Sequence, residues 1–321
     1  MEENNYFKVK ALSFSSLKNL LESPALFLGM LNKKPSSEAL TIGNLVDALL
    51  TERDRFDELF LLKKAKEPSG LMLPYVEALL RNDGNFEKAY LESGYKQSEA
   101  SIREKFEKEG KEWYNEQLEL KTSSKSLYTQ EEYSRAIAVV SSLQNNKFIA
   151  QCFEISNENE EIFKQLEIYW KYKGIDLKSK LDVVKINRKN KKIILYDLKT
   201  TGYSVNSFYD SVIKYSYWLQ MSMYGMAIYH YFKDKIENIK EYDIEFKWIV
   251  ESTKYPGSPI IYNMSKEDAD KGVNGGKIDG KYVKGFIQLI EDYIWYTETN
   301  QWTHKREIIE NNFECDISIF N

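Results

Sequence analysis

Three strand-like segments in close succession constrain the fold of this chain more than any other feature of its sequence. Residues 162–172, 177–186 and 192–199 are rich in β-branched and aromatic residues, which favour extended backbone. The residues between the second and third segments, Asn187 to Asn190, are polar and typical of a hairpin turn. These segments predict three consecutive strands, the last two of which pair as a hairpin.

The segments that follow predict further helices and strands. A long helix is expected over residues 205–231 and a strand over 244–251. A short strand near 260–261 and a final helix over 266–299 complete this part of the chain. Because helices and strands alternate in blocks in this way, the sequence predicts an α+β fold.

The N-terminal half is predicted to be mostly helical. Ser13 can cap a first helix, for which Pro24 marks the end, and a second helix is expected from Glu38 to Thr51. Residues 60–145 are charged and mostly helical. Near the end of that stretch Thr129 and Glu132 have the spacing of a capping box, which predicts the start of another helix.

Composition excludes several classes of protein. The chain has 2 Cys in 321 residues, too few for a disulfide scaffold or for a four-cysteine zinc or iron–sulfur site. No run of 18 apolar residues predicts a membrane span, and the acidic N-terminus lacks the layout of a signal peptide. We therefore expect a cytoplasmic protein without a membrane partner. The net charge of -4 neither indicates nor excludes nucleic-acid binding, which needs only a local basic patch.

Two aspartates and a lysine stand out within the strand-like region. Asp197 and Lys199 are two residues apart at the end of one predicted strand, so their side chains point to the same face. Asp182 lies in the preceding strand, and a tight hairpin can bring it beside them. A D-x-K triplet alone is mostly coincidental, but here it follows an apolar strand and precedes a long helix.

This combination suits hydrolysis of a phosphodiester bond. Two carboxylates can hold one or two hard cations through oxygen, which polarise a phosphate and lower the pKa of water. A lysine can position that water and stabilise developing charge. No phosphate-binding loop of an ATP-driven motor is present, and no base for a serine nucleophile is evident.

The motifs around these residues resemble the PD-(D/E)XK nuclease superfamily, and most closely the branch containing RecE, exonuclease VIII and the RecB nuclease domain. The resemblance rests on three runs, which are Lys180 to Val184, Ile194 to Thr201 and Tyr217 to Tyr224. It covers most of the chain and implies a mixed central sheet flanked by helices. Residues 1–321 would then form a single nuclease domain, with a catalytic core at 160–300 and a helical elaboration at 60–145.

The resemblance also implies roles for individual residues. Asp182 and Asp197 would be ligands of Mg²⁺ or Mn²⁺, and Lys199 would be catalytic. Gln220 and Tyr224 match the Q-x-x-x-Y motif of the helix after D-x-K, whose face would line the active site and touch DNA. The resemblance further implies that Gln220 takes part in catalysis and that Tyr217, Thr200 and Thr201 contact DNA. Glu167 matches a glutamate that recurs on the strand before the first Asp.

One position departs from the pattern of the family. Many relatives place a His after a small-residue helix start, as G-x-x-x-H, whereas this chain has Gly43 followed by Asp47. An Asp can ligate a hard cation, but the change can equally mark a weakened or lost metal site. His230 and His304 offer no replacement and are expected to be structural or solvated. The turn from Arg188 to Lys192 is basic, but basic hairpin turns are more often solvated than in contact with DNA.

The leading hypothesis is a metal-dependent exodeoxyribonuclease that acts on ends of linear double-stranded DNA in phage-type recombination. By analogy with RecE-type enzymes it would form a homo-oligomer and work with a single-strand annealing protein. Two alternatives remain open: a non-catalytic DNA-binding protein on the same fold, which only Asp47 favours, and a metal-dependent endonuclease in repair or defence. Digestion of closed circular DNA would separate an endonuclease from an end-dependent enzyme.

Overall fold

The computed structural model describes residues 6, 9–31, 37–123 and 125–314. The chain divides into two compact units, one formed by residues 1–52 and 137–321 and the other by residues 53–136. Residues 1–5 and Cys315, which entered the sequence predictions, lie outside the described residues. None of the helices described is long and apolar enough to cross a membrane.

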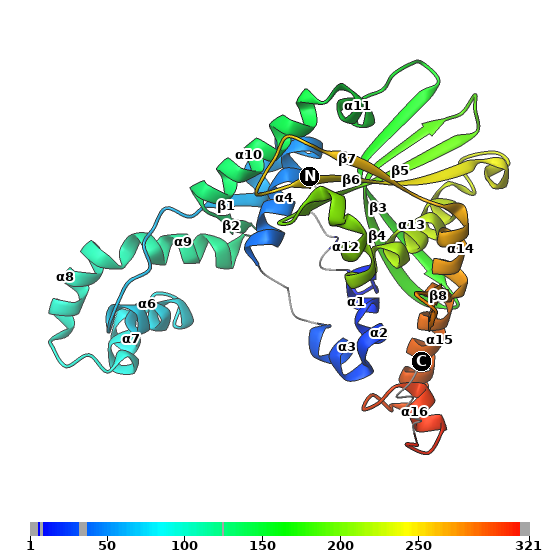
Figure 1. The fold of residues 1–321 in the computed structure, drawn as a ribbon. Helices are drawn as coiled ribbons and strands as arrows, with labels where there is room; N and C mark the ends of the chain where they lie inside the picture. The colour runs from blue at the N-terminus through cyan, green and yellow to red at the C-terminus, as the bar shows by residue number, and fades with distance from the viewer. Residues whose placement is uncertain (1–5, 7–8, 32–36, 124, 315–321) are drawn as a thin grey trace. The chain divides into compact units, whose positions relative to one another are not determined.

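The first unit is built on a five-stranded sheet (Figure 1). The strands, in their order across the sheet, are β3 (Glu160–Tyr172), β4 (Ile175–Asn187), β5 (Lys192–Thr201), β6 (Asp243–Ser252) and β7 (Ile260–Met264). Strands β3, β4 and β5 are antiparallel neighbours, β5 and β6 are parallel, and β6 and β7 are antiparallel. The sheet is therefore mixed, as expected, and the turn after Asn187 joins β4 to β5 as a hairpin.

Helices surround this sheet, and α13 packs on β3 and β4 while α4 packs on β5 and β4. Figure 1 shows α13, α14 and α15 lying together beside the strands. The helices of this unit are α1 (Phe14–Leu17), α2 (Asn19–Glu22), α3 (Pro24–Met30), α4 (Glu38–Thr51), α11 (Lys147–Ala150), α12 (Phe208–Lys214), α13 (Tyr217–Phe232), α14 (Lys266–Asn274), α15 (Phe286–Thr299) and α16 (Arg306–Glu310), with 3₁₀ turns η2 (Gln151–Phe153), η3 (Val205–Ser207) and η4 (Ile239–Glu241). The bounds predicted for α4 are confirmed.

The predicted helix over residues 205–231 is wrong in its continuity. Ser216 has φ +56°, in the left-handed region, and this residue separates α12 from α13. A non-glycine residue rarely adopts this conformation, so the sequence carries no strong signal for the break. Helix α13 begins at Tyr217 directly after this break, and it carries three of the candidate site residues, Tyr217, Gln220 and Tyr224.

The predicted final helix over residues 266–299 is wrong in its middle. It is divided into α14 and α15 by a short hairpin of β8 (Gly276–Ile278) and β9 (Lys281–Val283). Asp279 and Gly280 form its turn with φ +49° and +78°, the conformation that Asp-Gly favours in tight hairpins. That dipeptide was the local signal for the hairpin.

The core of the first unit is rich in aromatic side chains. Trp170 of β3 stacks on Phe286 of α15, with ring centroids 5.7 Å apart. His230 lies against the same tryptophan at 5.1 Å, and burial lowers its pKa. This placement favours the expected structural role of His230.

The second unit contains four main helices around a small core of its own. Tyr75, Ile102 and Phe106 are among its buried side chains. Its elements are η1 (Arg53–Arg55), α5 (Phe56–Leu59), β1 (Phe60–Leu62), α6 (Met72–Arg81), α7 (Phe86–Ser93), α8 (Glu99–Glu109), α9 (Lys111–Thr122) and β2 (Ser126–Tyr128). Strands β1 and β2 pair in parallel, a feature that the prediction of a mostly helical segment missed.

Helix α10 (Gln130–Asn145) spans the boundary in sequence between the two units. The predicted capping box at its start is confirmed. The backbone N–H of Thr129 donates to Glu132 Oε2 at 2.7 Å, and the Glu132 N–H donates to Thr129 Oγ1 at 3.2 Å.

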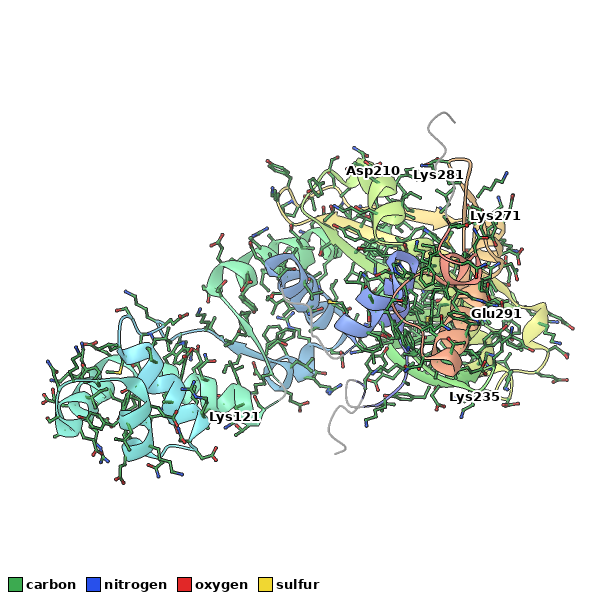
Figure 2. The ribbon with its side chains drawn as sticks, turned by 90° about the horizontal axis from the view of Figure 1, so that it is seen from below. Lys121, Asp210, Lys235, Lys271, Lys281 and Glu291 are labelled. Atoms are coloured by element: carbon green, nitrogen blue, oxygen red, sulfur yellow. The ribbon has the colours of Figure 1, made fainter. Side chains whose placement is uncertain are left out.

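Charged side chains of both signs cover the surface. Figure 2 labels several of them, including Lys271 on α14 and Lys121 on α9. Many are paired locally, as Lys271 is with Glu267 at 2.6 Å and Lys121 is with Asp83 at 3.2 Å. Exposed pairs of this kind add little to stability and largely cancel the local charge.

Candidate active site

The strands β4 and β5 part at the position of Asp182. Their ladder runs from the pair of Asn187 with Lys192 to the pair of Val183 with Tyr196, and Asp182 is the next residue along β4. Its Oδ2 accepts a 2.7 Å hydrogen bond from the backbone N–H of Leu198. The carboxylate thus satisfies a β5 donor at the point where the two strands diverge.

The divergence opens a cavity of about 820 Å³ that contains the predicted site. Nine of the residues singled out from the sequence line it, from α4, β4, β5 and α13. They are Asp47, Asp182, Asp197, Lys199, Thr200, Thr201, Tyr217, Gln220 and Tyr224. The structure therefore brings together residues that are far apart in the sequence, from Asp47 to Tyr224.

Asp197 and Lys199 share one face of β5, as the alternation of side chains predicted. Lys199 Nζ lies 2.6 Å from Asp197 Oδ2 and 4.7 Å from the centre of the Tyr217 ring. Burial alone would lower the pKa of Lys199, but the charges of Asp197 and Asp182 outweigh it, so that its pKa is raised. Lys199 is therefore held as a buried cation.

The carboxyl groups of the cavity all have raised pKa values. Burial is the largest cause for each, and for Asp182 the charges of Asp47 and Asp197 add to it. Burial raises the pKa of Asp47 to about 6, against the opposing charge of Lys180. Desolvation therefore disfavours the ionised form of each aspartate, and a bound divalent cation would stabilise these carboxylates.

Helix α4 delivers Asp47 to the cavity. Gly43, one turn earlier, packs against β5 so closely that a Cβ there would lie 3.2 Å from Thr200 Oγ1. Asp47 Oδ1 accepts a 2.7 Å hydrogen bond from Gln165 Nε2 of β3. The Asp47 carboxylate is thus oriented within the cavity.

Gln220 and Tyr224 form one hydrogen-bonded unit on α13. Gln220 Nε2 donates to Tyr224 Oη at 2.9 Å, across the expected four-residue spacing. Gln220 Oε1 is buried and has no hydrogen-bond partner among the described residues. A buried amide oxygen without a partner is costly, and it is available to a donor on a ligand.

The donor set fits a divalent cation of the magnesium type. Asp197 Oδ2 is buried and accepts no hydrogen bond of favourable geometry from the described residues, although Lys199 Nζ is 2.6 Å away. Within the described part of the chain no three His, Cys, Asp or Glu side chains are close enough to form a metal site by themselves. Magnesium commonly uses one or two carboxylates and takes its other ligands from water and substrate phosphates, so Asp182 and Asp197 can suffice.

Some predicted residues lie elsewhere. Glu167 is not among the residues that line the cavity, and its carboxylate accepts a 3.0 Å hydrogen bond from Tyr169. Three of the four cations of the basic turn are paired, since Arg188 meets Glu161, Lys191 meets Glu241 and Lys192 meets Glu245. These pairs compete with any phosphate contact by the turn.

Several residues of the site were missed from the sequence. Lys18, Lys254, Tyr203 and Tyr215 also line the cavity, and Gln165 holds Asp47. The pKa of Lys18 is lowered by burial and then by the charge of Lys199. A lone lysine or tyrosine in a loop gives no local signal, because only the fold brings it to the cavity.

The family model of a PDDEXK-like domain of unknown function (DUF3799) matches residues 13–275. The chain belongs to this family. The matched range includes every residue that lines the cavity. A search of curated proteins gave no match.

A solved structure shares the fold of this PDDEXK-like chain. The crystal structure of a candidate exonuclease from Eubacterium rectale has a TM-score of 0.50 and 11% identity, covering 100% of this chain and 96% of that one. At that identity the likeness shows the fold alone. A structure named SSO0001 has a TM-score of 0.25 and 9% identity over 83% of this chain and 88% of its own, which carries no argument. The predicted PD-(D/E)XK fold is confirmed.

Proposed function

We propose that this PDDEXK-like protein is a metal-dependent deoxyribonuclease that uses Asp182, Asp197 and Lys199 for hydrolysis of a phosphodiester bond. The observation that carries the proposal is the single cavity in which these residues meet Asp47 and Gln220. Nothing in this arrangement requires a nucleophile from the protein, because water can serve as the attacking group.

Asp182 and Asp197 would hold Mg²⁺ or Mn²⁺ directly, and Asp47, which lines the same cavity without forming a three-carboxylate cluster with them, would bind the cation through water. A bound cation of this kind withdraws charge from the phosphate and acidifies the attacking water. Lys199 contributes a fixed positive charge, because its raised pKa keeps the ammonium protonated at neutral pH. Gln220 Oε1 offers an acceptor that can orient the water or a hydroxyl of the substrate.

The three aspartates of the cavity favour catalysis over a non-catalytic DNA-binding role. That alternative rested on Asp47 in place of a histidine. Asp47 is nevertheless held in the cavity by Gln165, and its carboxylate, with a pKa of about 6, is mostly ionised at neutral pH. A retired site would have no reason to keep three desolvated carboxylates together, because each costs stability without a cation.

The finer parts of the proposal rest on the resemblance to RecE-type enzymes. They are action on the ends of linear double-stranded DNA, a homo-oligomer, a single-strand annealing partner and a role in phage-type recombination. Fold-level analogy supports these parts, and the residues of the cavity do not.

Digestion of linear and closed circular duplex DNA side by side tests both the metal-dependent hydrolysis and its dependence on DNA ends. We expect loss of linear DNA that requires Mg²⁺ or Mn²⁺, while closed circles persist. Cleavage of closed circles would make the protein an endonuclease and overturn the end-dependent part alone. Binding of DNA without hydrolysis under any of the metal conditions would contradict the nuclease proposal.

A further inference from the structure

The mouth of the cavity carries exposed tyrosine rings. Tyr203 is 70% exposed and Tyr215 is 40% exposed, and both line the cavity that holds Lys199. Tyr255 is 79% exposed and follows Lys254, which lines the same cavity. Large aromatic rings left in water at a binding site are costly unless a ligand covers them.

The backbone beneath these rings is held in place. The Tyr203 N–H donates to Thr201 Oγ1 at 3.1 Å, and Thr201 O in turn accepts from the Thr253 N–H at 2.8 Å. These bonds join the end of β5 to the turn after β6. In that turn the Tyr255 N–H donates to Ser252 Oγ at 3.2 Å. The exposed rings therefore sit on a fixed edge, which is the requirement for a preformed binding surface.

A line of contacts connects Tyr215 to Lys199. The rings of Tyr215 and Tyr217 lie 5.6 Å apart, and the Tyr217 ring lies under Lys199 Nζ at 4.7 Å. The hydroxyls of Tyr203 and Tyr255 make no hydrogen bond to other described residues, so these two rings have no evident structural task.

The cations around the cavity are few. Three lysines line it, Lys18, Lys199 and Lys254, and no arginine does so among the described residues. Surfaces that hold duplex DNA by its backbone use many lysines and arginines, because each neutralised phosphate adds to binding. So few cations beside two exposed rings, Tyr203 and Tyr215, favour recognition of bases over recognition of two phosphate backbones.

From this we infer that the strand to be cut enters the cavity unpaired, with its bases stacked on Tyr203 and Tyr215 and its phosphates near Lys18 and Lys254. A base in a duplex is covered on both faces by its neighbours, so only an unpaired base can use an exposed ring. Stacking of one base on an aromatic side chain contributes about 1–3 kcal/mol. The inference rests on the proposed function and specifies the form of DNA that the site accepts.

Binding of 2-aminopurine oligodeoxynucleotides tests the inference without hydrolysis. The fluorescence of this base is quenched when it stacks on an aromatic ring. The probes would be a short single strand with 2-aminopurine near its end and the same strand in a blunt duplex, each with Ca²⁺ in place of Mg²⁺. We expect quenching and tighter binding with the single strand. Tyr203→Ala and Tyr215→Ala should each weaken that binding roughly 5- to 100-fold.

Two further variants separate stacking from folding. Tyr203→Trp keeps a stacking surface and should bind the single strand at least as tightly as the wild type. Tyr282→Ala removes a ring that is 59% exposed but lines a different cavity, and it should leave binding unchanged. Equal binding of the single strand by the wild type and both alanine variants would overturn the inference.

Failure of the stacking inference and failure of the nuclease proposal give different results. If the alanine variants bind normally while the wild type digests DNA in a metal-dependent way, the nuclease proposal stands and the stacking inference fails. If quenching behaves as expected while no DNA is hydrolysed with Mg²⁺ or Mn²⁺, the stacking inference stands and the nuclease proposal fails.

Discussion

Gln165 Nε2 of β3 donates a 2.7 Å hydrogen bond to Asp47 Oδ1 of α4, and Gln165 does so from a left-handed backbone conformation with φ +50°. The β3–β4 ladder is continuous except at this point, where the pair of Gln165 with Asp182 is missing. A strand residue rarely adopts positive φ, and the conformation costs of order 1 kcal/mol. The strained backbone thus lies at Gln165, which orients the Asp47 carboxylate and stands opposite Asp182 at the gap in the ladder.

Replacing Gln165 should weaken metal-dependent hydrolysis more than it weakens the fold. We expect Gln165→Ala to lower the Mg²⁺ affinity or the rate about 10- to 100-fold, because residues that orient a ligand have effects of this size. Gln165→Gly accepts positive φ without strain and should be about 1 kcal/mol more stable than Gln165→Ala. Both variants should lose activity equally in magnesium titrations. Recovery of activity in the glycine variant would mean that Gln165 acts only through the backbone.

Asp47→Asn should stabilise the metal-free protein at neutral pH. The pKa of Asp47 in the folded state is about 6, above the unfolded value of 3.8, so its ionisation removes stability as pH rises through that window. Asparagine keeps an acceptor for Gln165 and carries no charge. We expect the gain in free energy of unfolding to be about 1–2 kcal/mol near pH 8 and close to zero near pH 4.

Urea unfolding with EDTA at the two pH values measures this gain. Addition of Mg²⁺ should then stabilise the wild type more than the Asp47→Asn variant, because the variant has lost a carboxylate that binds the cation through water. An identical response to Mg²⁺ would remove Asp47 from the proposed ligands.

Gly43→Ala should impair catalysis through the position of α4. The added Cβ would lie 3.2 Å from Thr200 Oγ1, so the helix must shift by a few tenths of an ångström or Thr200 must turn. We expect about a tenfold loss of hydrolysis rate, since small misplacements of a catalytic group are costly. The double variant with Thr200→Ser should recover part of the rate, because a hydroxyl without the neighbouring γ-methyl group turns more freely away from the added Cβ. Gly29→Ala, at a helical glycine where a Cβ meets nothing within 4 Å, is the control and should be neutral.

The motifs of the site could be predicted because their chemistry is local. Asp197 and Lys199 share a face by strand alternation, and Gln220 and Tyr224 share one by helical spacing. The bounds of α4 and the capping box of Thr129 were predictable for the same reason, since capping residues and apolar spacing lie within a few positions.

The remainder depends on contacts between distant segments. Gln165 and Asp47 are 118 residues apart, and nothing near either residue indicates the other. Ser216 was an unexpected break because a serine in the left-handed region is stabilised by its surroundings and has no strong preference of its own. Tyr203 and Tyr255 are ordinary loop residues in the sequence, and only the meeting of β5 with the turn after β6 gives them a common edge.

The rate of Mg²⁺-dependent hydrolysis of linear DNA by the wild type and by Lys199→Ala tests the central claim most directly. Both proteins would first be shown to unfold at similar temperatures, with Lys281→Ala as an exposed-lysine control. We expect a loss of at least about 100-fold in Lys199→Ala, since the ammonium stabilises charge that develops on the phosphate, and no loss in the control. Hydrolysis by a folded Lys199→Ala protein at the rate of the wild type would mean that this lysine has no part in catalysis and that the proposed site is wrong.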